Sequence, residues 1–211
     1  MSKWMNQMRQ RWIWAGCYLL ALALWLVAGF WGWGVDAVAS ATGRLFPFSL
    51  TAQQFELVDL SQQEDGSLLT TSLDPQMIWR VPAQQTVRSL RMWVEFDQTP
   101  REMCLYYTTK EGEPFSLEKR VFAKQLEDGS YLYTLPQTQI VSLRLDPCSP
   151  LEGYPVTMTI EKMELNEPVG FASWLIPTPY QWFELVVYPA LAASFLSIVW
   201  QGLKTRKNKH T

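Results

Sequence analysis

The sequence has little of the material from which most catalytic sites are built. It contains one histidine, His210, at its extreme end, and three cysteines. Ser–His, Cys–His and histidine–metal sites are therefore excluded for the central part of the chain. The sequence contains no glycine-rich phosphate loop and no dinucleotide-binding fingerprint. We therefore expect no enzyme activity, no catalytic residue, no cofactor and no bound metal.

Carboxylates are plentiful, and they leave one enzymatic alternative open. Glu95 with Asp97, or Glu111 with Glu113, could form the acid pair of a hydrolase or part of a calcium site. Both pairs fall on expected strand exteriors or in turns, and no Asp-x-Asp-x-Asp loop accompanies them. A solvated acidic surface is the simpler interpretation.

Negatively charged residues are missing from the two ends of the chain. All 20 Asp and Glu fall between Asp36 and Glu184, and they leave the middle with a net charge of about −9. Positive charge flanking apolar runs marks the cytoplasmic side of a membrane, so we expect both termini in the cytoplasm and the middle outside. A basic nucleic-acid-binding surface is not supported. The terminal cations are Lys3, Arg9, Arg11, Lys204, Arg206, Lys207 and Lys209.

Two long apolar runs are present, and each is long enough to cross a bilayer of about 30 Å as a helix. They predict a first transmembrane helix over 12–34 and a second over 182–203. Residues 1–11 form a cytoplasmic N-terminus, and residues 204–211 form a basic cytoplasmic tail. The alternative for the first run is a cleaved signal peptide, for which residues 37–39 offer an imperfect cleavage site.

Small side chains mark where these helices could pack closely. A lone pair four residues apart occurs in the first run, and a longer stripe occurs in the second, where a helix of this chain or of another protein would fit. The candidate packing residues are Ala28, Gly32, Ala190, Ala193, Ser194 and Ser197.

The residues between the runs change period. Apolar and polar side chains alternate over 90–96 and 156–161, which is the pattern of half-buried strands, and Asp-Gly, Glu-Gly and Asp-Pro turns separate the strands. We expect a membrane-anchored all-β protein: a 35–50 connector, an antiparallel, jelly-roll-like β-sandwich over 51–167, and an interfacial re-entry segment over 168–181. Further strands are expected near 54–60, 67–72, 76–81, 102–109, 130–135 and 139–145, and only 115–125 could hold a short helix.

Exposed aromatic residues are the remaining functional material of the outer domain. Trp93 has the polar-face phase of its strand, and three tyrosines lie near it in sequence or in turns. An aromatic platform surrounded by acids can hold a sugar ring. The candidates for contact with a sugar or a partner are Trp93, Tyr106, Tyr131 and Tyr133; the alternative is that Trp93 faces the second sheet, another protein or lipid.

Two of the three cysteines, Cys104 and Cys148, lie in the expected outer domain. A disulfide between them is one candidate, because an extracytoplasmic location is oxidising. Two free, buried thiols are the alternative and the commoner outcome.

Several segments together resemble a bacterial outer-face module: 105–107, 114–118, 131–136 and 140–147, preceded by Asp74-Pro75-Gln76. That module is a jelly-roll-like β-sandwich attached to membrane glycosyltransferases and related polytopic proteins of envelope glycan assembly. The resemblance covers about 54–165 and rests on strands and turns. The glycosyltransferase domain and its many-helix membrane body are missing from this chain, so transferase activity is not implied.

The resemblance implies a location in the bacterial cytoplasmic membrane and a role in the cell envelope. We expect a non-enzymatic accessory subunit of a polysaccharide assembly or export system, bound to the lipid bilayer and to a polytopic glycosyltransferase or transporter. A membrane-anchored glycan-binding protein that uses exposed aromatics is the alternative.

Overall fold

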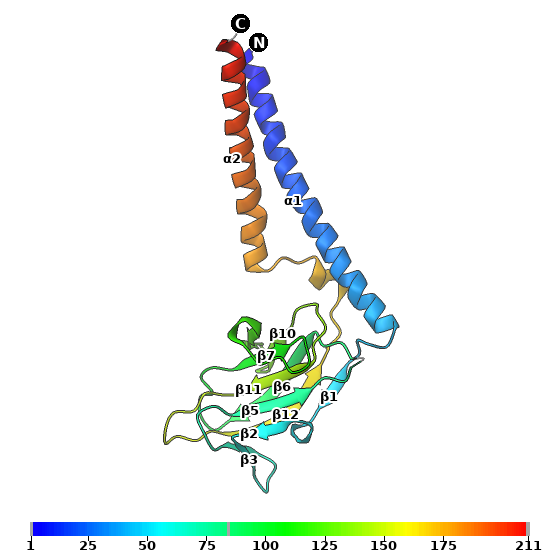
Figure 1. The fold of residues 1–211 in the computed structure, drawn as a ribbon, viewed down its shortest axis with the longest axis vertical. Coiled ribbons are helices and arrows are strands. Elements are labelled where there is room, and N and C mark those ends of the chain that lie inside the picture. Colours follow the sequence, from blue (N-terminus) through cyan, green and yellow to red (C-terminus); the bar gives the residue numbers. More distant parts are fainter. Residues whose placement is uncertain (1, 84, 210–211) are drawn as a thin grey trace. The chain divides into compact units, whose positions relative to one another are not determined.

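A computed structural model describes residues 2–83 and 85–209 of the chain. The chain divides into two compact units, one made of residues 1–35 with 169–211 and the other of residues 36–168. The first is built from helices and the second from strands (Figure 1). His210 lies outside the described residues.

The helical unit contains two long helices, α1 (Ser2–Ala41) and α2 (Pro179–Lys209), and the short 3-10 helix η3 (Phe171–Trp174). Both long helices extend beyond the runs 12–34 and 182–203. Residues 36–41, which belong to the expected connector 35–50, continue α1. None of them is a glycine or a proline that would end the helix. Gly43, at φ +67°, ends the helix, and the Arg44 amide then donates to the Ala39 carbonyl oxygen.

Side chains of α1 contact α2 within the helical unit. The Tyr18 hydroxyl donates to the Val186 carbonyl oxygen at 3.1 Å, and the Arg9 guanidinium lies 5.0 Å from the centre of the Trp200 ring. Both helices are long and apolar enough to cross a membrane, judged by length and composition alone.

The described part of residues 36–168 forms two antiparallel sheets that pack as a β-sandwich (Figure 1). One sheet has seven strands in the order β3-β4-β12-β6-β10-β9, with β1 paired to β12. The other has five, in the order β2-β5-β11-β7-β8. The strands are β1 (Phe48–Leu50), β2 (Glu56–Val58), β3 (Leu60–Gln62), β4 (Leu68–Thr70), β5 (Gln76–Arg80), β6 (Ser89–Phe96), β7 (Cys104–Thr108), β8 (Arg120–Phe122), β9 (Lys124–Gln125), β10 (Tyr131–Thr134), β11 (Ser142–Asp146) and β12 (Thr157–Leu165).

The predicted alternation explains the core between the sheets. Leu90 and Met92 of β6 and Met158 and Met163 of β12 are fully buried, while Arg91 between the first two points to the outer surface. β12 keeps this pattern despite a bulge between Ile160 and Lys162, where the pairing with β6 shifts by one residue.

The segment 115–125 differs from the expected short helix. It holds one 3-10 turn, η2 (Leu117–Lys119), followed by β8 and β9. The chain leaves the five-stranded sheet after Phe122 and enters the seven-stranded sheet at Lys124, so Ala123 alone crosses from one sheet to the other.

The chain enters and leaves the sandwich at the same end. β1 pairs antiparallel with the last part of β12, so that Phe48 lies opposite Leu165. Asn166, which is buried, ties this end together: its amide nitrogen donates to the Phe46 carbonyl at 3.2 Å and to the Thr86 carbonyl at 2.7 Å. Both connections to the helical unit therefore start from neighbouring points of the sandwich.

Candidate functional site

Trp93 lies on the outer face of the seven-stranded sheet, as the alternation of β6 indicates. The guanidinium of Arg91 lies 4.5 Å and the ammonium of Lys162 lies 4.9 Å from the centre of its ring. Arg91 is held in turn by the carboxylates of Glu167 and Asp128. The half-buried indole is thus part of a network of charges and is not an open stacking platform.

Tyr106 lies on the outer face of the other sheet, opposite Arg144 of β11. The Arg144 guanidinium lies 5.0 Å from the centre of the Tyr106 ring and pairs with Asp146 at 2.7 Å and with Asp74 at 2.9 Å. Burial raises the pKa of the Asp146 carboxyl, although the bonded guanidinium opposes this shift. Arg144 and Asp146 therefore form a partly buried ion pair on this face.

The structure does not gather the four aromatic candidates into one platform. Trp93 and Tyr106 lie on outer faces of different sheets, whereas Tyr131 and Tyr133 share the inward phase of β10. Tyr133 is fully buried, so its expected contact with a sugar or partner is wrong. Tyr131 lines a cavity.

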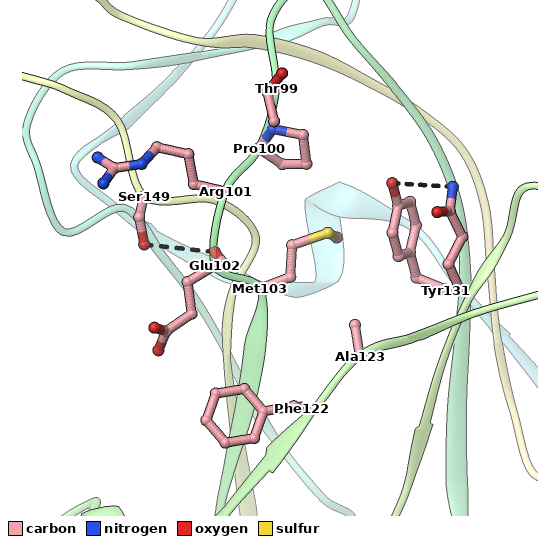
Figure 2. Close-up of a pocket in the computed structure, with 10 residues that line it drawn as sticks. Thr99, Pro100, Arg101, Glu102, Met103, Phe122, Ala123, Tyr131 and Ser149 are labelled. Atoms are coloured by element: carbon pink, nitrogen blue, oxygen red, sulfur yellow. Dashed lines mark hydrogen bonds between the residues drawn. The ribbon is translucent and has the colours of Figure 1, made fainter.

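That cavity has a volume of about 740 Å³ and lies where the chain crosses between the sheets (Figure 2). Tyr131 of β10 and Phe122 of β8 lie on two of its sides, with Ala123 between them. The loop before β7 completes it, and the Met103 thioether points toward the Tyr131 ring. The lining residues are Thr99, Pro100, Arg101, Glu102, Met103, Phe122, Ala123, Gln125, Tyr131 and Ser149.

Both aromatic walls of the cavity are held in place by neighbours. The Tyr131 ring meets the Phe96 ring edge to face, with centres 6.4 Å apart. One face of Phe122 is covered by the Arg120 guanidinium, 4.4 Å from the ring centre, and Arg120 is paired with Glu102 at 3.0 Å. Phe122 nevertheless remains 55% exposed.

The polar groups around the cavity are few. The Gln125 amide donates to the Tyr131 hydroxyl at 3.5 Å, and the Ser149 hydroxyl donates to the Glu102 carbonyl oxygen at 3.4 Å (Figure 2). The Arg101 guanidinium points away from Tyr131. Sequence reasoning missed Phe122 and Gln125 because a short helix was expected there. Residues 121–124, Val-Phe-Ala-Lys, show no alternation of apolar and polar side chains that could have indicated the two strands.

A second hollow, of about 800 Å³, lies beside β5 and β11. One wall is the loop after β7, which Glu113 holds together: its carboxylate accepts bonds from the Lys119 ammonium and from the Thr109 amide. These bonds, that of Lys119 first, lower the pKa of Glu113 to about 2.

One carboxylate of each pair considered for a hydrolase accepts a hydrogen bond from a backbone amide. Asp97 accepts a hydrogen bond from the Thr157 amide at 2.9 Å, and Glu113 is bonded as described above. No cluster of three or more His, Cys, Asp or Glu suited to a metal ion occurs within the described residues.

Cys104 and Cys148 are both buried and both free, so the disulfide considered from the sequence is not formed. Burial raises the pKa of the Cys104 thiol to about 11 and that of Cys148 to about 12. The expected extracytoplasmic location could not decide whether the disulfide forms, because a disulfide also needs the two Cα atoms to lie within about 7 Å of each other.

The small-residue stripe of α2 is largely covered inside the helical unit. Ala193 and Ser197 are buried, and Ala190 and Ser194 are half-buried. On α1, Gly32 is buried and Ala28 is exposed, so within this chain Ala28 does not contact α2 or η3, and its packing against another protein stays a prediction.

The close approach on α1 occurs at Gly29, one position along the helix from Ala28. A Cβ atom there would lie 2.8 Å from the Trp174 carbonyl oxygen of η3. The Phe171 ring lies beside it, 5.7 Å from the Phe30 ring and 5.3 Å from the Trp33 ring, measured between centres. Sequence reasoning missed Gly29 because spacing alone does not show which face of a helix meets a neighbour.

No protein-family model matches this sequence, and no curated protein matches it either. Solved structures do match. A low-affinity xylan-binding module from Roseburia intestinalis is 14% identical over 57% of this chain and 94% of its own, with a TM-score of 0.39. A family two carbohydrate esterase from Cellvibrio japonicus is 10% identical over 58% of this chain and 33% of its own, with a TM-score of 0.36.

A third match is CsCBM6-3 from Clostridium stercorarium, solved in complex with cellobiose. It is 7% identical over 59% of this chain and 95% of its own, with a TM-score of 0.29. At these identities and TM-scores, the likenesses carry no argument about what this chain binds. They also do not show the envelope-glycan module that the sequence resembles. The chain is therefore characterised by its own geometry: a β-sandwich of two antiparallel sheets that is flanked in sequence by two apolar helices.

Proposed function

We propose that this chain is a non-enzymatic accessory subunit of a bacterial envelope glycan assembly or export system, anchored in the cytoplasmic membrane by α1 and α2. Its sandwich lies on the extracytoplasmic side, over a polytopic partner. The partner is a glycosyltransferase or a transporter of lipid-linked sugars.

The uncovered apolar surface of the helices supports the membrane anchoring on which this proposal depends. No residue of the most apolar 18-residue stretch of α1 is buried, and only 17% of the corresponding stretch of α2 is. Trp12, Leu19 and Trp31 are 72%, 65% and 75% exposed. The core helix of a water-soluble protein would bury these side chains, so lipid or a membrane protein is their natural environment.

The two chain connections of the sandwich support a hairpin topology. Residues Phe46 and Asn166 are joined by a hydrogen bond at one end of the sandwich, so both helices can enter the membrane from the same side. The basic residues of both chain ends then lie together in the cytoplasm. The acidic sandwich lies outside.

The accessory role is tested by purifying the full chain from native membranes in mild detergent. We expect a polytopic protein with glycosyltransferase or transporter sequence to elute in constant ratio with it. Elution of the chain alone, with the helices intact, contradicts an accessory role. A reporter fused after Thr211 should be cytoplasmic, and N-terminal sequencing of the membrane-bound protein should find residues 1–34 retained; loss of that segment would identify a signal peptide.

The second candidate function is binding of a glycan by the anchored sandwich. One observation favours it: Tyr131, chosen from the sequence as a sugar contact, lines a cavity together with an exposed phenylalanine. This candidate is compatible with the accessory role, because a subunit that lies over a glycan exporter would meet the product.

A further inference from the structure

We propose that the cavity of Figure 2 binds a sugar ring of a neutral saccharide between Phe122 and Tyr131. This inference rests on the second candidate function, glycan binding, and names its site and its ligand class. It replaces the surface around Trp93 as the place where the sugar would bind.

Size and location suit a saccharide. A volume of about 740 Å³ falls in the range of small-molecule sites, about 300–1,000 Å³. Short strands and loops border the cavity at one edge of the sandwich: β8 and β9 are the edge strands of the two sheets. A longer glycan could therefore extend beyond the bound ring without meeting another strand.

The aromatic walls supply the apolar part of recognition. The faces of sugar rings carry C–H groups that stack on aromatic rings. Arg120 covers only one face of Phe122, and its pairing with Glu102 holds the ring from that side. The opposite face of an exposed phenylalanine has no packing role in the sandwich core, and this face is where we place the sugar. Because the ring is already held, little side-chain entropy is lost on binding.

The polar groups complete the recognition of hydroxyls. The bond between the Gln125 amide and the Tyr131 hydroxyl is long, at 3.5 Å, so both groups keep donor or acceptor capacity for a ligand. The side chain of Glu102 is 52% exposed and can accept further bonds from sugar hydroxyls.

Charge selects a neutral ligand over an acidic one. Among the ten described lining residues, Arg101 is the only cation, and its guanidinium points away from Tyr131. The nearby Arg120 is already engaged by Glu102. A uronic acid bound between the two aromatic rings would thus meet the Glu102 carboxylate with no guanidinium directed at it, and repulsion would weaken its binding.

The test uses the full chain in phospholipid nanodiscs, because maltoside and glucoside detergents carry sugars that would compete. Cellobiose, chitobiose and maltose are the neutral probes, and a disaccharide that contains glucuronic acid is the acidic probe. Binding is measured by saturation-transfer NMR and by titration calorimetry, with empty nanodiscs as blank. We expect at least one neutral probe to bind, and the acidic probe to bind at least fivefold more weakly.

Variants assign the binding to the cavity. Phe122→Ala should weaken binding at least tenfold, whereas Phe122→Tyr, which keeps the ring, should retain it within about threefold. Gln125→Ala should weaken binding severalfold. Phe46→Ala removes a ring that is 40% exposed and does not line the cavity, and it should change nothing. Circular dichroism of each variant checks that the sandwich remains folded.

The outcomes separate this inference from the broader function. Binding that survives Phe122→Ala but is lost in Trp93→Ala overturns the cavity as the site and leaves glycan binding in place. Tighter binding of the acidic probe overturns the ligand class. If no neutral probe binds at 20 mM, both this inference and the glycan-binding candidate fail, while co-purification still decides the accessory role.

Discussion

The hydroxyl of Tyr133 provides a sharp test of the structure, because removing it should stabilise the protein. Tyr133 is fully buried in the sandwich, and among the described residues its hydroxyl has no hydrogen-bond partner. Burying such a group without a partner costs about 1–3 kcal/mol. Tyr133→Phe removes this cost and leaves a void of one oxygen atom, which costs less than about 0.5 kcal/mol at ~24 cal/mol per Å³.

The expected net gain is therefore about 1 kcal/mol or slightly more, which raises the melting temperature by roughly 4 °C for a domain of 100–200 residues. Thermal unfolding of the sandwich, followed by circular dichroism in nanodiscs, measures it. Burial raises the pKa of the Tyr133 phenol, so the gain should be constant from pH 6 to pH 9. The control is Tyr131→Phe: that hydroxyl lines the cavity and already accepts a bond, so little change is expected. A less stable Tyr133→Phe variant would mean that the hydroxyl has a partner and would refute the reasoning.

Three further predictions follow from contacts elsewhere. Gly29→Ala should loosen η3, because the new Cβ would lie 2.8 Å from the Trp174 carbonyl oxygen. Faster cleavage of η3 by chymotrypsin would measure this loosening. Gly16→Ala is the matched control, because a Cβ there would have nothing within 4 Å. Glu113→Gln should lower the urea midpoint at pH 7. Since the pKa of Glu113 is lowered from 4.5 to about 2, the wild-type advantage should be complete above pH 4.5 and shrink as the pH falls toward 2; an advantage that does not change with pH contradicts the ion pair. Burial raises the pKa of Cys104 to about 11 and that of Cys148 to about 12. In the folded protein both thiols should therefore react with maleimide at pH 8 at least ~100-fold more slowly than an exposed thiol. After unfolding without reductant, both should be labelled completely. Mass spectrometry that finds them unlabelled after unfolding would indicate a disulfide.

The sandwich could be predicted because its signals are local. Alternation over 90–96 and 156–161 requires only that each strand has one buried face, and the structure places β6 and β12 there. The segment 115–125 could not be assigned in this way, because β8 and β9 are too short to show a period. Three residues that line the candidate cavity, Phe122, Ala123 and Gln125, lie in that segment, so the cavity was missed apart from Tyr131.

The aromatic candidates show the limit of reasoning from sequence. Phase within a strand predicts that Tyr131 and Tyr133 share a face, and they do. It does not tell which of the two lies at the rim of the sandwich and which lies at its centre, because that depends on the length of the opposite sheet. Burial of Tyr133 and exposure of Phe122 follow from where each strand stands in its sheet.

The order of residues alone determined the element types: two apolar runs that favour helices, and an acidic middle whose period of two favours strands. Those properties depend on neighbours within one turn or one strand, and a single sequence displays them. Only the tertiary structure decided which residues meet: Gly29 with η3, and Asn166 with the Phe46 carbonyl where the chain enters and leaves the sandwich. These contacts join residues far apart in the chain, so they depend on how sheets and helices pack rather than on any local pattern.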